Sequence, residues 1–315
     1  MDWSQFLEEA FLVSLLAGAL RLSTPIILAG LGEVYAERSG VLNLGVEGVM
    51  LMGAFASFWG TTVTGSAWLG LLIGMLAGAA MGALMAFFTV TLKVDQVISG
   101  MGIYLLGGGM SSFLYRIAYG VRMLPPSIEG LSGLTIPVLS DLPIIGPVLF
   151  QHDALVYIAL ILVPVLGFIL SRTTLGLKIR AVGENPEAAD TLGINVDATR
   201  YLCVILGGVL GALGGAYISI AHLKIFADNM TVGRGFIAVA IVYFGKWRPF
   251  MTFVGALVFG SAYALQLWIQ ASGAPIPHQL LLMLPYALTI VILAVVARQA
   301  RGPAALTRPF RRGEG

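Results

Sequence analysis

Four polar residues border or lie within long apolar runs of this sequence. Asn43 and Glu47 are four residues apart near the start of the run Val41–Trp59, which places them on one face of a helix. Asn229 and Arg234 precede a short apolar run. A charge at membrane depth is costly, so it is usually paired or lines a water-filled path. The pattern predicts a substrate path containing these four residues. A structural ion pair of Glu47 with Arg234, or interfacial snorkelling, is the alternative.

Sequence signatures of catalysis are missing from the chain. The phosphate-binding pattern Gly-x-x-x-x-Gly-Lys-Ser/Thr does not occur, since the Gly-Lys pair at 245–246 is followed by Trp247. The three histidines, His152, His222 and His278, are far apart in the sequence, and no cluster of carboxylates accompanies them. Neither a metal site nor metal catalysis is therefore indicated. An enzyme is the weaker class of function, and no cofactor is expected in this chain.

The composition is typical of an integral membrane protein. Of the 315 residues, 58% are apolar and 11% are charged, and the mean hydropathy is +0.91. Soluble domains have about 45–50% apolar and about 25% charged residues. A bilayer can cover apolar surface that a soluble fold of this size could not bury. The net charge of +2 argues against a nucleic-acid-binding protein.

The apolar runs predict an all-α polytopic membrane protein with about nine transmembrane segments, since a helix needs about 20 mostly apolar residues to cross the hydrocarbon core. The second segment carries polar residues near its start, and the seventh is too short to cross alone. Both are predicted to be broken or re-entrant helices, which membranes tolerate where they line a cavity or are buried in protein. The segments are Phe11–Gly30, Val41–Trp59, Ala67–Val90, Val97–Arg116, Ala154–Leu170, Tyr201–Ala221, Gly235–Gly245, Phe250–Ile269 and Gln279–Ala297.

The lysines and arginines predict the orientation. With the N-terminus outside and the C-terminus inside, most of the 18 Lys and Arg residues fall in cytoplasmic loops, in agreement with the positive-inside rule. Two loops are long. The external loop, 118–153, is rich in proline and is expected to be irregular, whereas the cytoplasmic loop is 171–200. Residues 1–315 are expected to form a single transmembrane domain with these two loops.

The cytoplasmic loop contains a short predicted helix whose two ends are specified by the sequence. Asn185 is a good N-cap, Pro186 suits the first helical position, and Gly193 can take the left-handed conformation that ends a helix. A small apolar face with acidic and amide edges suits insertion into a groove of a partner protein. A well-capped loop helix of no special role has the same pattern. The residues assigned to this docking element are Glu184, Asn185, Pro186, Glu187, Ala188, Ala189, Leu192 and Gly193.

Two rows of glycines with a spacing of four occur in the third and sixth segments. Each row lies on one helix face and allows close contact with another helix. Packing within the chain is the favoured interpretation, and pairing between subunits is the alternative. The rows are Gly74, Gly78 and Gly82, and Gly207, Gly211 and Gly215.

Three stretches of the chain carry a family resemblance. Residues 22–55 read LSTPIILAGLGEVYAERSGVLNLGVEGVMLMGAF, residues 182–196 read VGENPEAADTLGINV, and residues 229–249 read NMTVGRGFIAVAIVYFGKWRP. Together with the tail at 302–306, they resemble, over nearly the whole chain, the nucleoside permeases of the ABC importer superfamily. This superfamily also serves simple sugars and branched-chain amino acids. The stretch 182–196 is similar to the shared ATPase-coupling loop, and 229–249 is the most specific to the nucleoside branch.

The resemblance implies a permease subunit of an ATP-driven importer that carries nucleosides across a bacterial-type cytoplasmic membrane. The expected partners are a second permease in a heterodimer, a cytoplasmic ABC ATPase that binds ATP and Mg²⁺, and an extracytoplasmic lipoprotein receptor of the basic-membrane-protein type. A simple-sugar permease of the same superfamily and an ion-coupled secondary transporter are the alternatives.

Overall fold

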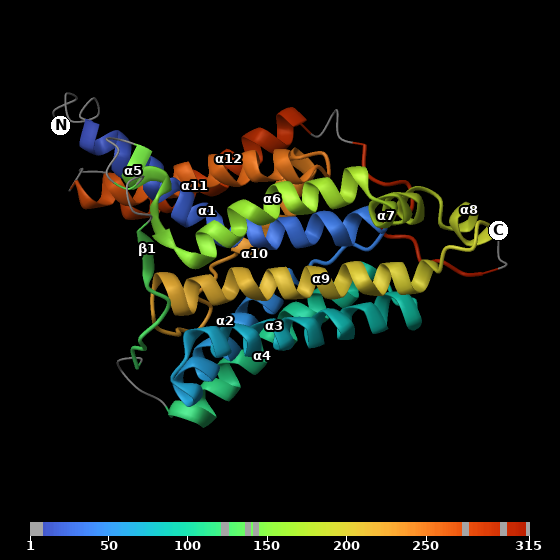
Figure 1. Ribbon diagram of the computed structural model, residues 1–315, viewed down its shortest axis with the longest axis horizontal. Coiled ribbons are helices and arrows are strands. Elements are labelled where there is room, and N and C mark those ends of the chain that lie inside the picture. Colours follow the sequence, from blue (N-terminus) through green and yellow to red (C-terminus); the bar gives the residue numbers. More distant parts are fainter. Residues whose placement is uncertain are drawn as a thin grey trace.

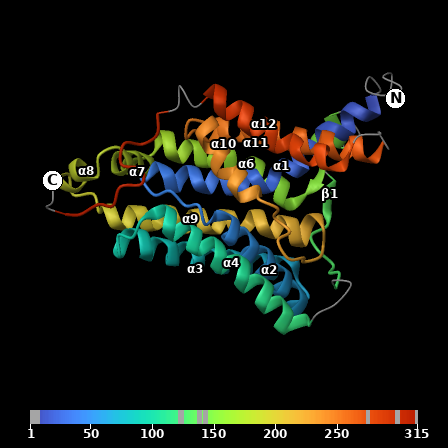
Figure 2. The same cartoon turned by 180° about the vertical axis from the view of Figure 1, so that it is seen from behind.

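The computed structural model is an elongated bundle whose helices run mostly along one axis (Figure 1). It describes residues 9–120, 126–135, 140, 145–272, 277–296 and 301–312. The start of α1 and the last described segment, residues 301–312, lie toward opposite ends of the bundle, and the short helices α7 and α8 are near the last described segment, which is also visible from behind (Figure 2).

Helices make up most of the described chain. In chain order, the elements are α1 (Glu9–Arg38), α2 (Val46–Thr64), α3 (Ala67–Ala86), the π-helical turn η2 (Phe87–Thr91), α4 (Gln96–Tyr119), β1 (Gly133–Thr135), α5 (Ile145–Leu149), β2 (Gln151–Asp153), α6 (Ala154–Arg172), α7 (Thr174–Glu184), α8 (Pro186–Thr191), α9 (Val196–Ala216), the π-helical turn η3 (Tyr217–His222), α10 (Arg234–Phe244), α11 (Pro249–Ala271) and α12 (His278–Val296).

Seven helices in the described part of the chain are long and apolar enough to cross a membrane. They correspond to seven of the nine predicted segments. The other two segments give α10, which has 11 residues, and α12, whose described apolar part is Gln279–Leu288. Ala297, the predicted end of the last segment, lies outside the described residues. The prediction of about nine spans is therefore confirmed for seven segments.

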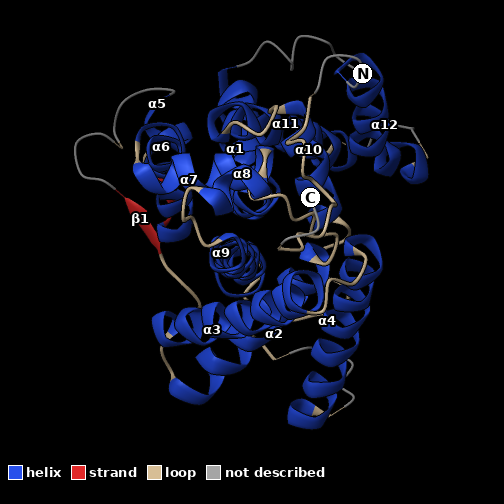
Figure 3. Cartoon of the chain, turned by 90° about the vertical axis from the view of Figure 1, so that its right-hand side faces the viewer, coloured by secondary structure: helices blue, strands red, loops and turns tan. Residues whose placement is uncertain are grey.

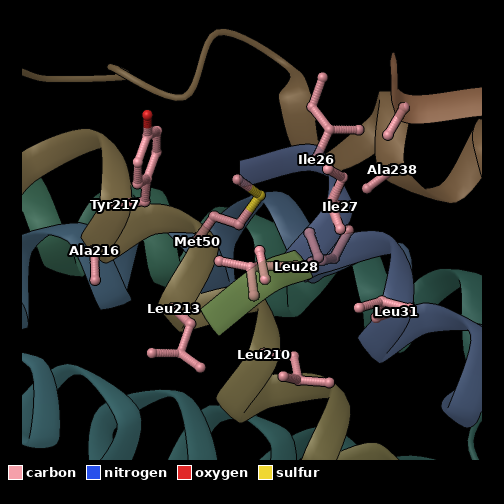
Figure 4. Packing of buried hydrophobic residues seen from close by; sticks show 14 of the residues in the cluster. Ile26, Ile27, Leu28, Leu31, Met50, Leu210, Leu213, Ala216, Tyr217 and Ala238 are labelled. Atoms are coloured by element: carbon pink, nitrogen blue, oxygen red, sulfur yellow. The ribbon is translucent and has the colours of Figure 1, made fainter. Parts of the chain in front are cut away.

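Helix α9 occupies the middle of the bundle. Seen along the bundle axis, it lies between a layer of α2, α3 and α4 and a group that includes α1, α6, α10 and α11 (Figure 3). The core forms where apolar residues of α1, α2 and α9 meet, such as Leu28, Met50 and Leu210 (Figure 4). Because α9 is far from α1 and α2 in the sequence, the core joins the first quarter of the chain to its second half.

The glycine rows pack helices of this chain against one another. A Cβ atom on Gly78 of α3 would collide with Ala212 and with the carbonyl oxygen of Gly208, both on α9. A Cβ atom on Gly82 would lie 2.8 Å from the carbonyl oxygen of Val204. Only glycine permits this close approach of two helix backbones. The favoured interpretation, packing within the chain, is confirmed at this crossing.

The loop predicted to be external contains the only strands in the described residues, so the all-α prediction needs a small correction. The three-residue strands β1 and β2 pair antiparallel, with Leu134 opposite His152. Backbone bonds from Ile128 to Lys224 (3.1 Å) and from Leu131 to Ile220 (2.9 Å) attach the loop to η3 and the residues after it. Prolines in this loop prevent a long helix, and its backbone groups therefore pair with distant segments instead.

Candidate functional site

Glu47, in the first turn of α2, binds the start of α10. Its Oε1 atom accepts hydrogen bonds from the Thr231 hydroxyl (2.6 Å) and the Gly233 N–H (2.7 Å), and its Oε2 atom accepts one from the Gly235 N–H (2.6 Å). The side chain is 1% exposed. A carboxylate at a helix N-terminus satisfies amides that have no partner within the helix. We call Glu47, Thr231, Gly233 and Gly235 the central junction.

The central junction lies at mid-height in the bundle. Gly48, the neighbour of Glu47, is in close contact with Gly107, which is near the middle of α4. From the junction, α10 runs toward Trp247, whose carbonyl oxygen accepts a bond (3.0 Å) from Arg38 at the end of α1. Its 11 residues span about 16 Å, roughly half of the hydrocarbon thickness. The seventh segment is therefore a half-helix, in agreement with the predicted broken segment.

Asn43 and Glu47 do not share a helix face, and this part of the prediction is wrong. Helix α2 begins at Val46, five residues after the predicted start. Asn43 lies in the preceding turn, where its Oδ1 atom accepts a bond from the Gly45 N–H (3.0 Å). A short side chain that satisfies the backbone in this way favours a turn over a helix. Asn43 is also buried and donates to Glu33 (3.2 Å).

Asn229 and Arg234 lie beside the residues of the central junction in the chain, and Arg234 is half-buried. Asn229 is exposed and has a positive φ of 56°. The guanidinium of Arg234 lies 5.5 Å from the ring centre of Tyr263, a cation–π contact, and donates to the Met230 carbonyl oxygen at 3.4 Å. The hydrogen bonds of both Glu47 oxygens go to the hydroxyl and amides described above, so Glu47 and Arg234 do not form the ion pair considered as the alternative.

An aromatic group at the junction was missed by the sequence analysis. Phe236, in the first turn of α10, is 37% exposed, and its ring centre is 5.3 Å from that of Tyr104 on α4. The Tyr286 hydroxyl of α12 donates to the Val232 carbonyl oxygen (3.0 Å). These three aromatic residues come from separate helices. No local pattern in the sequence identifies them as neighbours.

Two buried glutamates of α1 were also missed, because the predicted first segment ended at Gly30. Glu33 accepts from Asn43, and Glu37 accepts from the Trp247 indole N–H at 2.6 Å. Both side chains are fully buried. Since Trp247 lies three residues after the end of α10, Glu37 holds the C-terminal end of this half-helix while Glu47 holds its start. The spacing of four between Glu33 and Glu37 was the available signal.

The predicted capped helix of the cytoplasmic loop is present as α8. Asn185 Oδ1 accepts a bond from the Ala188 N–H (3.0 Å), and Pro186 is the first residue of the helix. Gly193 has φ = 78°, the left-handed conformation expected for the stop. Glu184 and Glu187 are exposed at its N-terminal edge. The local signals in the sequence thus predicted this helix and both of its ends.

The predicted apolar face of α8 is divided between the interior and the solvent. Ala189 is 2% exposed and packs with Val182 and Val196, whereas Ala188 is exposed and Leu192 is 81% exposed. Ala189 therefore anchors α8 to the protein and is not available to a partner, which corrects its predicted place on the docking face. The cause is the preceding helix α7, which lies beneath α8 and covers one side of it.

Comparison with known proteins identifies the family. Residues 15–293 match the family model described as the permease component of the branched-chain amino acid transport system. The chain belongs to this permease family.

Relatives include a permease named for a glucose ABC transporter, TsgC13 of Haloferax volcanii, with 46% identity over 83% of this permease and 79% of the relative. The nucleoside ABC transporter permease NupC of Lactococcus lactis is 38% identical over 92% and 94% of the two chains. The guanosine ABC transporter permease NupQ of Bacillus subtilis is 38% identical over 93% and 94%.

A solved structure shares the fold of this permease. It is a transporter described as being of the metal-chelate ABC type in an inward-facing conformation, with a TM-score of 0.50, 18% sequence identity, and coverage of 90% of this permease and 86% of that chain. This similarity shows the fold. The family, the ABC transporter permeases among the relatives and the membrane-spanning helices show that the chain is a multi-pass membrane permease of an ABC importer.

Proposed function

We propose that the permease carries nucleosides across the cytoplasmic membrane as one of two membrane-spanning subunits of the importer. Its N-terminus would lie outside and its C-terminus inside, as the positive-inside rule requires. A separate cytoplasmic ATPase would bind ATP and Mg²⁺ and hydrolyse the ATP, and a lipoprotein receptor would deliver the substrate from outside. The single transmembrane domain would contribute the path and the surface on which the ATPase acts.

The names of two relatives support nucleosides as the substrate class. NupC and NupQ, each 38% identical to this permease over nearly their full length, are named for nucleoside and guanosine transport. A second permease from each of the same two organisms, NupB and NupP, also matches this chain, at 26% and 27% identity. Two related permeases in one organism support a heterodimer of this chain with a second permease.

A simple sugar is the second candidate substrate. TsgC13, named for glucose transport, has the higher identity of 46%, but it matches a smaller share of this chain. TsgB13 of the same organism matches at 28% identity. Overall identity therefore favours a sugar, whereas coverage of the full chain favours a nucleoside.

The half-helix α10 is the observation that carries the proposed path. Broken helices at mid-membrane commonly form the substrate site of transporters, and α10 begins at the central junction. Asn229 is exposed and Arg234 is half-buried there, and both are proposed to face the path. The polar atoms of Asn43 and Glu47 are hydrogen-bonded within the protein. These two residues are therefore proposed to act indirectly, by holding α10 in place.

The aromatic rings beside the junction favour a nucleobase over a sugar alone. Phe236 and Tyr104 present aromatic surface at the start of α10. A nucleobase has a flat π-face that stacks on such rings, with a contribution of about 1–3 kcal/mol per base. A sugar ring has no π-face, so the same residues would distinguish the two substrate classes.

Uptake of a radiolabelled nucleoside tests this function. The gene would be restored to a deletion strain with and without its ATPase. We expect uptake to require both genes, and to be suppressed by unlabelled nucleosides but not by ribose or glucose. Suppression by the sugars with no effect of nucleosides would favour the sugar permease. Uptake that persists without the ATPase would indicate a secondary transporter.

A further inference from the structure

The last described segment of the chain, residues 301–312, crosses the cytoplasmic end of the bundle, and we call it the C-terminal strap. At its start, a Cβ atom on Gly302 would lie 3.0 Å from the Trp247 ring, so the two are in direct contact. Further along, the Ala305 N–H donates to the carbonyl oxygen of Gly183 in α7 (2.9 Å). The strap therefore connects the end of α10 with the helix that precedes α8.

The second half of the C-terminal strap is attached to α8 and α9. The Arg308 carbonyl oxygen accepts a bond from Arg200 (3.2 Å), a side chain of α9 that is only 1% exposed. Phe310 packs on the apolar cluster beneath α8. Arg312 forms an ion pair with Asp190 of α8 at 2.9 Å. These contacts place the strap beside the docking element rather than leaving it as a loose tail.

The C-terminal strap and α8 form the two walls of a groove of about 520 Å³. Glu184 and Glu187 lie on the α8 side, and Arg308 and Arg311 lie on the strap side. The groove thus presents negative charge along one wall and positive charge along the other. Such an arrangement favours a partner surface with the opposite order of charges.

Helix α8 is too small to be a complete docking surface. It has 6 residues, whereas a specific interface uses about 20–30 residues on each side. We propose that the importer's ATPase binds a composite surface made of α8 and the C-terminal strap, with Arg308 in contact with the partner. This inference rests on the proposed coupling to an ATPase and adds the strap to its binding surface.

Recovery of the ATPase with the permease tests the composite surface. The two permeases and the ATPase would be produced together and purified at low salt through a tag on this chain, and the ATPase recovered per permease would be measured. Arg308→Glu reverses a charge on the strap wall but keeps the carbonyl that Arg200 binds. We expect it to lower recovery about fivefold, as for a charged group in an interface rim. Arg301→Glu changes an exposed residue at the start of the strap that does not line the groove, and we expect no effect.

A variant of α8 separates failure of this inference from failure of the coupling proposal. Leu192→Arg changes the most exposed apolar side chain at the end of α8 and leaves the strap intact. Loss of ATPase recovery in both Leu192→Arg and Arg308→Glu would support the composite surface. Loss in Leu192→Arg alone would overturn the role of the strap and keep α8 as the docking element. Full recovery in both variants would overturn the ATPase-docking role of α8 as well.

Discussion

The central junction and the surface around α8 join separate segments of the chain in different ways. At the junction, a buried carboxylate receives three hydrogen bonds of 2.6–2.7 Å from the start of α10. Around α8, the connections are a capped helix, a small apolar cluster and an ion pair whose arginine side chain is 80% exposed. The carboxylate of the junction is buried, whereas the polar groups around α8 can exchange their contacts with solvent or a partner.

Polar residues in this permease therefore have two separate roles: buried ones hold helices together, and exposed ones form a surface for contacts. A buried donor without an acceptor costs about 1–3 kcal/mol, while an exposed ion pair is worth about 0–1 kcal/mol. Substitutions at the junction are therefore expected to change stability and uptake together. Substitutions around α8 are expected to change coupling and leave the stability of the bundle unchanged.

Replacing Glu47 is expected to have the largest effect. Glu47→Ala leaves the Thr231 hydroxyl and two amides of the 233–235 segment without an acceptor, at about 1–3 kcal/mol for each buried group. We expect a marked fall in the melting temperature of the purified permease pair and loss of nucleoside uptake. Thr231→Val, which removes one of the three bonds, should cause a smaller fall. A Glu47→Ala protein that melts like the wild type would show that the junction does not hold α10.

Gly235→Ala tests the close approach of α2 and α10. The new Cβ atom would lie 2.6 Å from Glu47 Cα and 2.7 Å from Glu47 N, and these are backbone atoms that can yield only if a helix moves. We expect a loss of about 1–3 kcal/mol in stability, as for overpacking in a core, and reduced uptake. Gly109→Ala in α4 is the control, since no atom lies within 4 Å of its Cβ position. Equal melting temperatures of the two variants would contradict the close contact.

Phe236→Leu distinguishes the path from the scaffold at the same junction. The change keeps an apolar side chain and removes the ring, so we expect little change in melting temperature. The KM for nucleoside uptake should rise about tenfold, if stacking on one base contributes about 1–3 kcal/mol. Phe113→Leu, which changes a 59% exposed aromatic residue of α4, is the control. An unchanged KM in Phe236→Leu would remove this residue from the proposed path.

The smallest effect is expected from Asn185→Ala, which removes the cap of α8. Loss of an N-cap costs about 1 kcal/mol, so amide hydrogen exchange in 187–192 should quicken about fivefold while the bundle melts as before. Asn195→Ala removes the equivalent cap of α9, where Asn195 accepts a bond from Ala198 (2.9 Å). Because α9 is held by extensive packing, its exchange should not change. A fall in melting temperature for Asn185→Ala would show that α8 is part of the stable core.

Sequence reasoning was most successful where the signal was local. Asn185, Pro186 and Gly193 specified α8 because caps and stops act within a few residues. The long apolar runs specified seven spans because bilayer thickness fixes helix length. The shortness of the run after Arg234 indicated a broken helix for the same reason. The glycine row through Gly78 indicated a helix crossing, although not which helix would be the partner.

Tertiary structure decided how the polar residues are used. The composition, the spans and the ends of α8 follow from the sequence, since each depends on neighbouring residues and on the solvent around them. The sequence did not indicate that Glu47 would receive the amides of α10, that Ala189 would face inward, or that the C-terminal strap would lie beside α8. The first and last of these outcomes depend on contacts between segments far apart in the chain, whereas Ala189 packs with the adjoining helices α7 and α9. The hydrogen-bond partner of a buried polar group is set by tertiary packing, and the packing of α1, α2 and α9 brings the distant segments of this chain together.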